Sequence, residues 1–189
     1  DFEAWGFRNT VVSLKSSDIE KTVKAARMFK ERSDYPFHLG VTEAGNVITA
    51  SVRSTWALGN LLKEGIGDTI RVSINGSIED EVLCANEILR TLGLKKGGVR
   101  IVACPRCGRH TFDSQGFLSR IQNRLYTLDK DITVAVMGCS VNGPGEAHNA
   151  DFAVTGNGRK IFLYVHGQLI ETIEDEREAE EKLFSLLNG

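Results

Sequence analysis

The first half of the chain alternates two hydrophobic patterns, one typical of strands and one typical of helices. Runs rich in β-branched and apolar residues predict three strands, at 9–15, 37–43 and 68–73. After each run, apolar residues recur every three or four positions and predict a helix. The first helix begins at Ile19, the second ends before Gly65 and the third spans 78–92. Three consecutive β-α units indicate a parallel sheet with helical crossovers, either in a barrel or in an open doubly wound sheet.

A glycine-rich stretch at 93–98 separates this half from a second predicted domain. In that domain we expect strands and helices in mixed order, at 99–103, 114–125, 132–137, 152–155, 160–165 and 174–187. Gly156 and Gly158 favour a hairpin between the last two of these strands. The predicted organisation is an α/β domain over 1–95, followed by a smaller α+β domain over 96–189.

Polar residues gather where the three strands of the first domain end. They are Lys15, Glu43, Arg71 and Ser73. Parallel α/β folds build their active sites at the carboxyl ends of the strands. A lysine, a glutamate and an arginine from three different strands therefore predict a functional site at this edge.

The composition narrows the class of protein further. The chain has 189 residues, 41% of them hydrophobic and 25% charged, and its net charge is −2. This charge gives no electrostatic reason to expect a nucleic-acid partner or an anionic membrane. No apolar run approaches the roughly 18 residues of a membrane span, and the first residues do not form a signal peptide. We expect a cytoplasmic protein.

Three of the four cysteines form a metal-binding pattern. Cys104 and Cys107 stand in a C-x2-C pair directly after a predicted strand, and Cys139 follows another predicted strand. Without a secretion signal, such a pair indicates metal or redox chemistry rather than disulfides. Thiolates select zinc, copper(I) or iron–sulfur clusters. Cys84 lies within a helical pattern and is expected to be a buried structural thiol.

The spacing alone leaves two metal sites open. A zinc ribbon could use Cys104, Cys107, His110 and Cys139, as a structural or nucleic-acid-binding module whose basic residues would be Arg100, Arg106, Arg109 and Arg120. An iron–sulfur cluster could instead use the three cysteines and Glu146. Between Cys139 and Glu146 the sequence Gly143-Pro-Gly145 predicts a sharply turned loop without bulky side chains, which can approach a cofactor closely.

Four segments taken together resemble one known family, and they span the chain in order. They are 38–45, 64–73, 103–109 and 138–147. They resemble the 4-hydroxy-3-methylbut-2-enyl diphosphate synthase family, which comprises iron–sulfur enzymes of the non-mevalonate isoprenoid pathway. The resemblance implies a [4Fe–4S] cluster held by Cys104, Cys107, Cys139 and Glu146, with Glu146 as an exchangeable ligand. It also implies a TIM-type barrel, to which this chain contributes the last three β-α units before the cluster domain.

The activity implied by the resemblance is the reductive ring opening and dehydration of 2-C-methyl-D-erythritol 2,4-cyclodiphosphate. Lys15, Arg71 and Ser73 would bind the substrate, and Glu43 would donate a proton to the departing water. The implied electron donor is ferredoxin or flavodoxin, and the implied assembly is a homodimer. Since three units cannot close a barrel, we expect this portion alone to be inactive. Asn46 stands where the family pattern has a second glycine.

Overall fold

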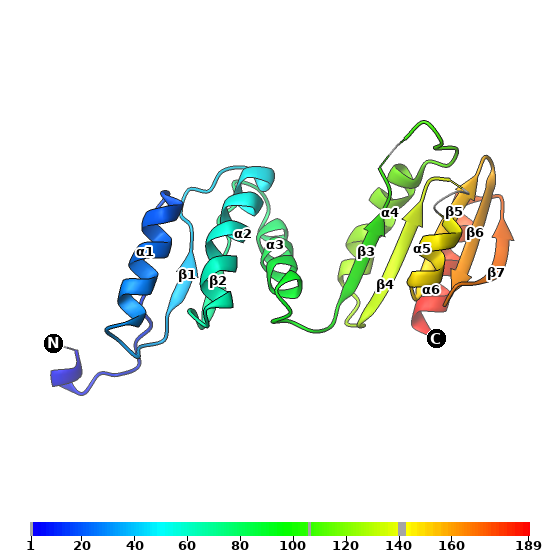
Figure 1. Ribbon diagram of the computed structural model, residues 1–189. Coiled ribbons are helices and arrows are strands. Elements are labelled where there is room, and N and C mark those ends of the chain that lie inside the picture. Colours follow the sequence, from blue (N-terminus) through cyan, green and yellow to red (C-terminus); the bar gives the residue numbers. More distant parts are fainter. Residues whose placement is uncertain (1, 106, 140–142) are drawn as a thin grey trace. The chain divides into compact units, whose positions relative to one another are not determined.

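The computed structural model describes residues 2–105, 107–139 and 143–189. The chain divides into two compact units, Asp1–Lys96 and Gly97–Gly189 (Figure 1). Each unit has its own sheet and its own hydrophobic core. No helix in the described part of the chain is long and apolar enough to cross a membrane.

The first unit alternates strands and helices. Its elements in chain order are the 3-10 helix η1 (Glu3–Trp5), α1 (Ile19–Lys30), β1 (His38–Gly40), α2 (Val47–Lys63), β2 (Thr69–Arg71) and α3 (Ile78–Thr91). β1 and β2 pair in parallel, with His38 opposite Thr69 and Gly40 opposite Arg71. The sequence-based prediction of parallel pairing through helical crossovers is confirmed for these two strands.

The predicted strand at 9–15 is wrong in extent. Its only ladder contact is an isolated parallel bridge between Val12 and Phe37. The His38 carbonyl accepts a hydrogen bond from the hydroxyl of Ser13 at 2.9 Å. Beyond Val12, the segment contacts the neighbouring backbone through this side chain rather than through a continued backbone ladder.

The helices of the first unit begin at polar caps and pack on one face of the strands. Asp18 accepts the amide of Lys21 at the start of α1, and Asn46 accepts the amide of Thr49 at the start of α2. Asn46 therefore has a structural role at the position where the family pattern has glycine. The buried face includes Leu39 and the α2 residues Leu58 and Leu61, and together with their neighbours they form the core of this unit.

The second unit is a five-stranded mixed sheet with three helices. Its elements in chain order are β3 (Val99–Ala103), α4 (Ser114–Tyr126), β4 (Ile132–Met137), α5 (Gly143–Asn149), β5 (Phe152–Asn157), β6 (Lys160–Val165), β7 (Gln168–Ile173) and α6 (Glu176–Asn188). The strands lie in the order β3-β4-β5-β6-β7. β3, β4 and β5 pair in parallel, whereas β5-β6 and β6-β7 are antiparallel hairpins.

Helices cover both faces of this sheet. On one face, α4 and α6 bury Phe117 and Leu183 against β4, β5 and β6 in the main core. On the other face, α5 places Ala147 in a smaller cluster with Ala135 of β4, and Cys104 packs against this cluster. The cysteine after β3 is therefore on the sheet face that α5 covers.

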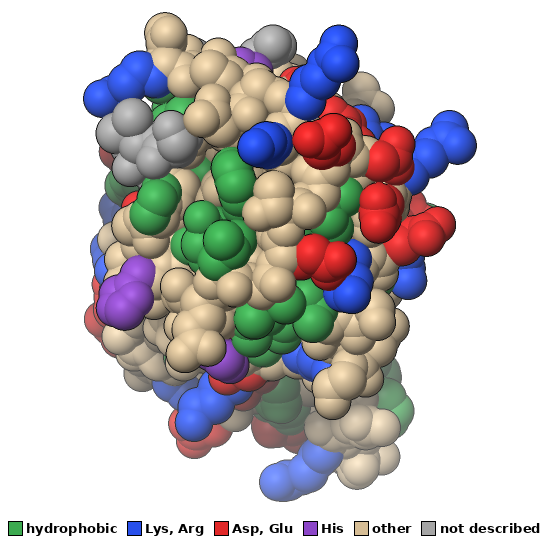
Figure 2. Space-filling view, turned by 90° about the vertical axis from the view of Figure 1, so that its right-hand side faces the viewer, with side chains coloured by type: hydrophobic (Ala, Val, Ile, Leu, Met, Phe, Trp, Pro, Cys, Tyr) green, Lys and Arg blue, Asp and Glu red, His purple; other side chains and the backbone are tan. Residues whose placement is uncertain are grey.

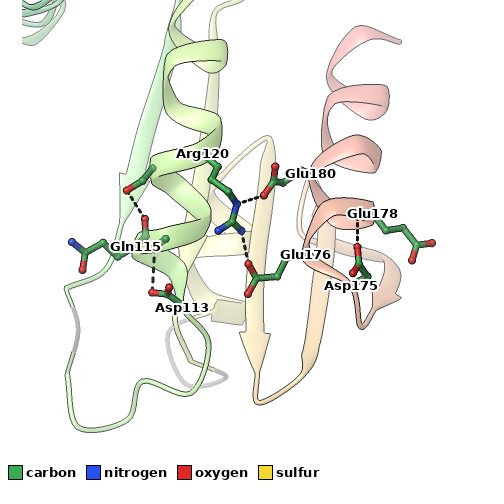
Figure 3. Close-up of polar contacts among 9 residues, drawn as sticks. Asp113, Gln115, Arg120, Asp175, Glu176, Glu178 and Glu180 are labelled. Atoms are coloured by element: carbon green, nitrogen blue, oxygen red, sulfur yellow. Dashed lines mark hydrogen bonds and ion pairs between the residues drawn. The ribbon is translucent and has the colours of Figure 1, made fainter.

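Polar contacts join the two helices of the main core. The Arg120 guanidinium on α4 donates hydrogen bonds to the carboxylates of Glu176 and Glu180 on α6 (Figure 3). One turn further along α4, the Arg124 guanidinium lies 3.6 Å from the centre of the Phe184 ring. Such cation–π contacts add to the apolar packing beneath them.

Two segments of the second unit depart from the sequence-based prediction. The loop predicted between Cys139 and Glu146 instead leads into the short helix α5, which begins at Gly143 and includes Glu146. Pro144 lies in its first turn, where a helix needs no amide from that residue, so proline does not prevent the helix. The edge strand β7 was not predicted, since Leu169 and Ile170 are both exposed and give no buried alternation.

The packing predicts which interaction between α4 and α6 stabilises the second unit most. Phe117 is fully buried, so Phe117→Ala is expected to lower the free energy of unfolding by about 3–5 kcal/mol. Arg120→Ala is expected to lower it by about 1 kcal/mol or less, because its ion pairs face solvent. Urea denaturation followed by circular dichroism measures both. Equal losses for the two variants would contradict this assignment of the core.

Candidate functional site

The strands of the first unit have one polar face. Residues of alternate parity share a face of a strand, and the apolar positions Phe37, Leu39 and Val72 are buried in the core. The intervening positions are Ser13, Lys15, His38, Gly40, Thr69, Arg71 and Ser73. A parallel sheet covered on both faces by helices has nearly continuous apolar strands. The polar face of these strands therefore suits the lining of a site.

Gly40 makes room for Lys15 on this face. A Cβ atom added to Gly40 would lie 3.2 Å from Lys15 Cε and 2.9 Å from the backbone oxygen of Arg71. The lysine side chain therefore crosses β1 at the one position without a side chain. Burial, followed by the nearby positive charge of Arg71, lowers the pKa of Lys15.

Arg71 and Ser73 are held together at the end of β2. The Arg71 Nε and Nη2 atoms donate to Ser73 Oγ at 3.1 and 2.8 Å. Because the serine oxygen accepts both bonds, its own proton is available for another acceptor. The two predicted residues therefore present an ordered guanidinium and a hydroxyl group side by side.

His38 belongs to the same group of residues, although the sequence analysis did not select it. Its Nδ1 atom lies 2.8 Å from Thr69 Oγ1 on the neighbouring strand. Burial is the largest cause that lowers the pKa of His38, followed by the positive charges of Lys15 and Arg71. The polar pair His38 and Thr69 within short parallel strands was the signal that could have identified this residue.

Glu43 lies in the loop between β1 and α2. Its backbone adopts a left-handed conformation with φ = 52°, which costs on the order of 1–3 kcal/mol for a residue with a side chain. The loop is fixed by hydrogen bonds from Arg53 Nη1 to the Ala44 carbonyl at 3.3 Å and from the Asn75 amide to the Gly45 carbonyl at 2.9 Å. The exposed Glu43 carboxylate has no hydrogen bond or ion pair to another described residue.

In the second unit, two cysteines come together at neighbouring strand ends. Cys104 follows β3 directly, and Cys139 lies two residues beyond the end of β4. The two strands pair in parallel with Ala103 opposite Val136. The Gly138 amide donates a hydrogen bond to Cys104 Sγ at 3.1 Å. The backbone next to Cys139 therefore contacts the thiol of Cys104.

The remaining cysteine of the pattern, Cys107, is exposed. Hydrogen bonding by the backbone amide of Arg109 is the main cause that lowers the pKa of its thiol, and the Arg109 side chain adds to this effect. A lowered thiol pKa favours the thiolate, which is the form that binds metals. The His110 amide donates to the Cys107 carbonyl at 3.0 Å and closes the turn.

Glu146 lies in the first turn of α5, beyond Cys139. Gly143 at the start of this helix permits a close approach to β5, because a Cβ atom there would lie 2.8 Å from Thr155 Cβ. The Gly143 amide donates to the Cys139 carbonyl at 3.1 Å. The half-buried Glu146 is therefore carried by a helix that is anchored to both Cys139 and the sheet.

The donor atoms fit a soft metal centre by their chemistry. Three unpaired thiols and a carboxylate lie on two strand ends, one turn and one helix of the same unit. Within residues 2–105, 107–139 and 143–189, no three His, Cys, Asp or Glu side chains are already gathered tightly enough to hold a metal ion. Metal binding commonly completes such sites by drawing the ligands together.

The predicted alternative of a nucleic-acid-binding zinc module finds less support. Arg120 is occupied by Glu176 and Glu180, and Arg100 Nε donates to Thr133 Oγ1 at 3.3 Å. Arg106 lies outside the described residues. On the face shown in Figure 2, acidic side chains gather together and basic ones are scattered around them. This face lacks the basic stripe of a nucleic-acid-binding surface.

Comparisons with known proteins agree with this division into two units. A sequence model described as the GcpE TIM-barrel domain matches residues 1–86, and one described as the GcpE protein C-terminal domain matches residues 100–188. Together the two matches cover most of the chain.

Curated relatives carry the name 4-hydroxy-3-methylbut-2-en-1-yl diphosphate synthase (flavodoxin). The protein from Treponema denticola is 45% identical over 181 residues, which is 96% of this chain and 47% of the relative. The protein from Treponema pallidum is 49% identical over 168 residues, covering 89% of this chain and 42% of the relative. The protein from Thermodesulfovibrio yellowstonii is 46% identical over 173 residues, which is 92% of this chain and 50% of the relative. The chain spans about half the length of these relatives.

The cluster of positive charges predicts a measurable coupling between Lys15 and His38. Lys15→Met removes one of the charges that lower the pKa of His38, so this pKa is expected to rise. It should stay below its ordinary value, because burial, the larger cause, remains. NMR titration of the His38 ring protons measures the change. Lys21→Met, which removes an exposed lysine on α1, is the matched control, and an unchanged pKa in Lys15→Met would contradict the arrangement.

Proposed function

Because the chain belongs to the GcpE family, we propose that it forms part of a 4-hydroxy-3-methylbut-2-enyl diphosphate synthase. The reaction is the reductive ring opening and dehydration of 2-C-methyl-D-erythritol 2,4-cyclodiphosphate. Residues 1–95 contribute three β-α units of a TIM-type barrel and its substrate-binding side, and residues 96–189 form the cluster domain. The observation that carries this proposal is the meeting of Cys104 with the backbone beside Cys139 at two parallel strand ends.

The proposed cofactor is a [4Fe–4S] cluster with Cys104, Cys107, Cys139 and Glu146 as ligands. When bound, it supplies low-potential electrons one at a time to a reaction that breaks two C–O bonds. Three thiolates hold the metal firmly, whereas the Glu146 carboxylate is a harder and weaker ligand for iron–sulfur centres. Glu146 is therefore the ligand that we expect to exchange during the reaction.

The positive face of the first unit suits the anionic substrate. Lys15 and Arg71 repel each other, and this repulsion adds to burial, the larger cause, in lowering the pKa of Lys15. A cyclic diphosphate placed between them would relieve this repulsion and accept charge-assisted hydrogen bonds. Ser73 would add the proton that its contact with Arg71 leaves available. These three residues are the proposed substrate-binding group.

Glu43 is the proposed proton donor to the departing water. It extends from the loop that follows β1, at the carboxyl edge where Lys15 and Arg71 also lie. The left-handed backbone at Glu43 is fixed by the neighbouring loop rather than by the carboxylate itself. The Glu43 carboxylate is exposed and forms no hydrogen bond or ion pair with a described residue, so it would be available for proton transfer.

The proposed electron donor is flavodoxin or ferredoxin, and the names of the relatives specify flavodoxin. The proposed assembly is a homodimer in which the cluster domain of one subunit closes over the barrel of its partner. This arrangement would bring the cluster to a substrate held by Lys15 and Arg71. We propose that the enzyme works in the cytoplasm, where thiols remain reduced.

A chimera tests the proposed function. This chain would replace the matched segment of the Treponema denticola relative, to which it is 45% identical. The chimera, purified without oxygen, is expected to convert the cyclodiphosphate with reduced flavodoxin, and the Cys139→Ser chimera should be inactive. A folded chimera that contains the cluster but does not convert the substrate would contradict the proposal.

Glu146→Cys in the same chimera tests the exchangeable ligand. A fourth thiolate is expected to keep the iron content or raise it, but to lower kcat at least tenfold, which is about 1.4 kcal/mol of transition-state stabilisation. Glu174→Cys, at an exposed position, is the matched control with an added thiol. Normal turnover by the Glu146→Cys chimera would show that Glu146 need not exchange.

A further inference from the structure

One buried nitrogen near the cysteines has no partner among the residues that the structure describes. His110 Nε2 is shielded from solvent and makes no hydrogen bond to any described residue. Thr10 Oγ1 and Ser54 Oγ share this property but lie in the first unit, away from the cysteines. Buried polar atoms are nearly always hydrogen-bonded, because leaving one unpaired is unfavourable. An unpaired nitrogen at this position points to a partner outside the residues that the structure describes.

The His110 imidazole lies against Gly138, which precedes Cys139 and contacts Cys104. A Cβ atom added to Gly138 would be 2.6 Å from His110 Cδ2, the ring atom bonded to Nε2. Gly138 immediately precedes Cys139, and its amide donates to Cys104 Sγ at 3.1 Å. The His110 amide donates to the Cys107 carbonyl at 3.0 Å. His110 is thus in contact with the backbone of the metal-binding pattern on two sides.

The segment that carries His110 is fixed in place. The amides of Thr111 and Phe112 both donate to the Gly138 carbonyl, at 2.9 and 3.2 Å. Phe112 is buried and packs over Gly156, where a Cβ atom would lie only 2.3 Å from the Phe112 ring. The backbone on both sides of the imidazole is therefore anchored, with the ring beside Gly138.

We propose that His110 is a positioning residue for the bound iron–sulfur cluster. Its Nε2–H donates a hydrogen bond to a sulfur atom of the cluster. This inference rests on the proposed function. Hydrogen bonds to cluster sulfurs help to set the reduction potential. A donor stabilises the more negative, reduced form of the cluster, so it raises the potential. His110 would therefore make the cluster easier to reduce without serving as one of its ligands.

Redox titration of three variants tests this role. The whole 189-residue chain and the variants His110→Phe, His110→Gln and His166→Phe would be reconstituted with iron and sulfide without oxygen. His110→Phe removes the donor and keeps a ring, whereas His110→Gln retains an N–H group. His166 is an exposed histidine of the same unit and provides the control. Circular dichroism checks folding, and His110→Leu replaces the phenylalanine variant if that variant is unfolded.

The expected result is that His110→Phe keeps its iron and has a more negative midpoint potential. A tenfold change in the ratio of oxidised to reduced cluster corresponds to about 59 mV for one electron, and we expect a shift of this order. His110→Gln should recover most of the wild-type potential, and His166→Phe should not change it.

Three outcomes would overturn the inference, and they can be told apart. Equal potentials in wild type and His110→Phe would reject the hydrogen bond and leave the proposed function intact. Loss of iron from a folded His110→Phe variant, with the cluster retained in wild type, would make His110 a ligand instead. A wild-type chain that takes up no cluster would overturn the proposed function and this inference together.

Discussion

The parallel pairing of β3 with β4 is the constraint on which the proposed cluster site depends. Parallel strands end at the same edge of a sheet, so residues far apart in the sequence meet there. The register that sets Ala103 opposite Val136 allows the Gly138 amide to reach Cys104 Sγ. The carbonyl of the same glycine accepts hydrogen bonds from the amides of Thr111 and Phe112, and this glycine lies against the His110 ring. A shift in this register would separate all of these groups at once.

In the first unit, the ends of parallel strands bring charged residues together, as the strand ends of the second unit bring cysteines together. β1 and β2 end together, and the missing side chain of Gly40 lets Lys15 cross the strand toward Arg71. Burial, followed by the neighbouring positive charges, lowers the pKa of both Lys15 and His38. Two cations and a histidine that form no ion pair with a carboxylate of the described residues make electrostatic sense if an anion binds between them. The proposed diphosphate substrate is such an anion.

Elements with a strong local pattern could be predicted from the sequence. Helix α1 begins at Ile19 as its apolar spacing predicts, and β1 and β2 pair in parallel as the alternation of strands and helices predicts. Features decided by tertiary contacts could not be predicted from the sequence. The segment at 9–15 contacts the neighbouring backbone through one isolated bridge and a serine hydroxyl rather than through a full ladder. β7 is an exposed edge strand without apolar alternation.

The candidate site shows the same division. The residue types at the strand ends identified Lys15, Arg71 and Ser73, and the structure brings these three together. His38 escaped notice because its importance comes from cross-strand register with Thr69 rather than from a motif. The segment from Cys139 to Glu146 was predicted as a loop, because glycine and proline dominate the first turn of α5. The packing of this helix against Thr155 cannot be read from the sequence.

The central claim is that Cys104, Cys107, Cys139 and Glu146 hold one iron–sulfur cluster. Iron, sulfide and zinc contents of the chain purified and reconstituted without oxygen test this claim most directly. The account predicts a brown protein with about four iron atoms and equivalent sulfide per chain, as expected for a [4Fe–4S] cluster. A colourless protein that contains one zinc ion per chain and no sulfide would contradict it.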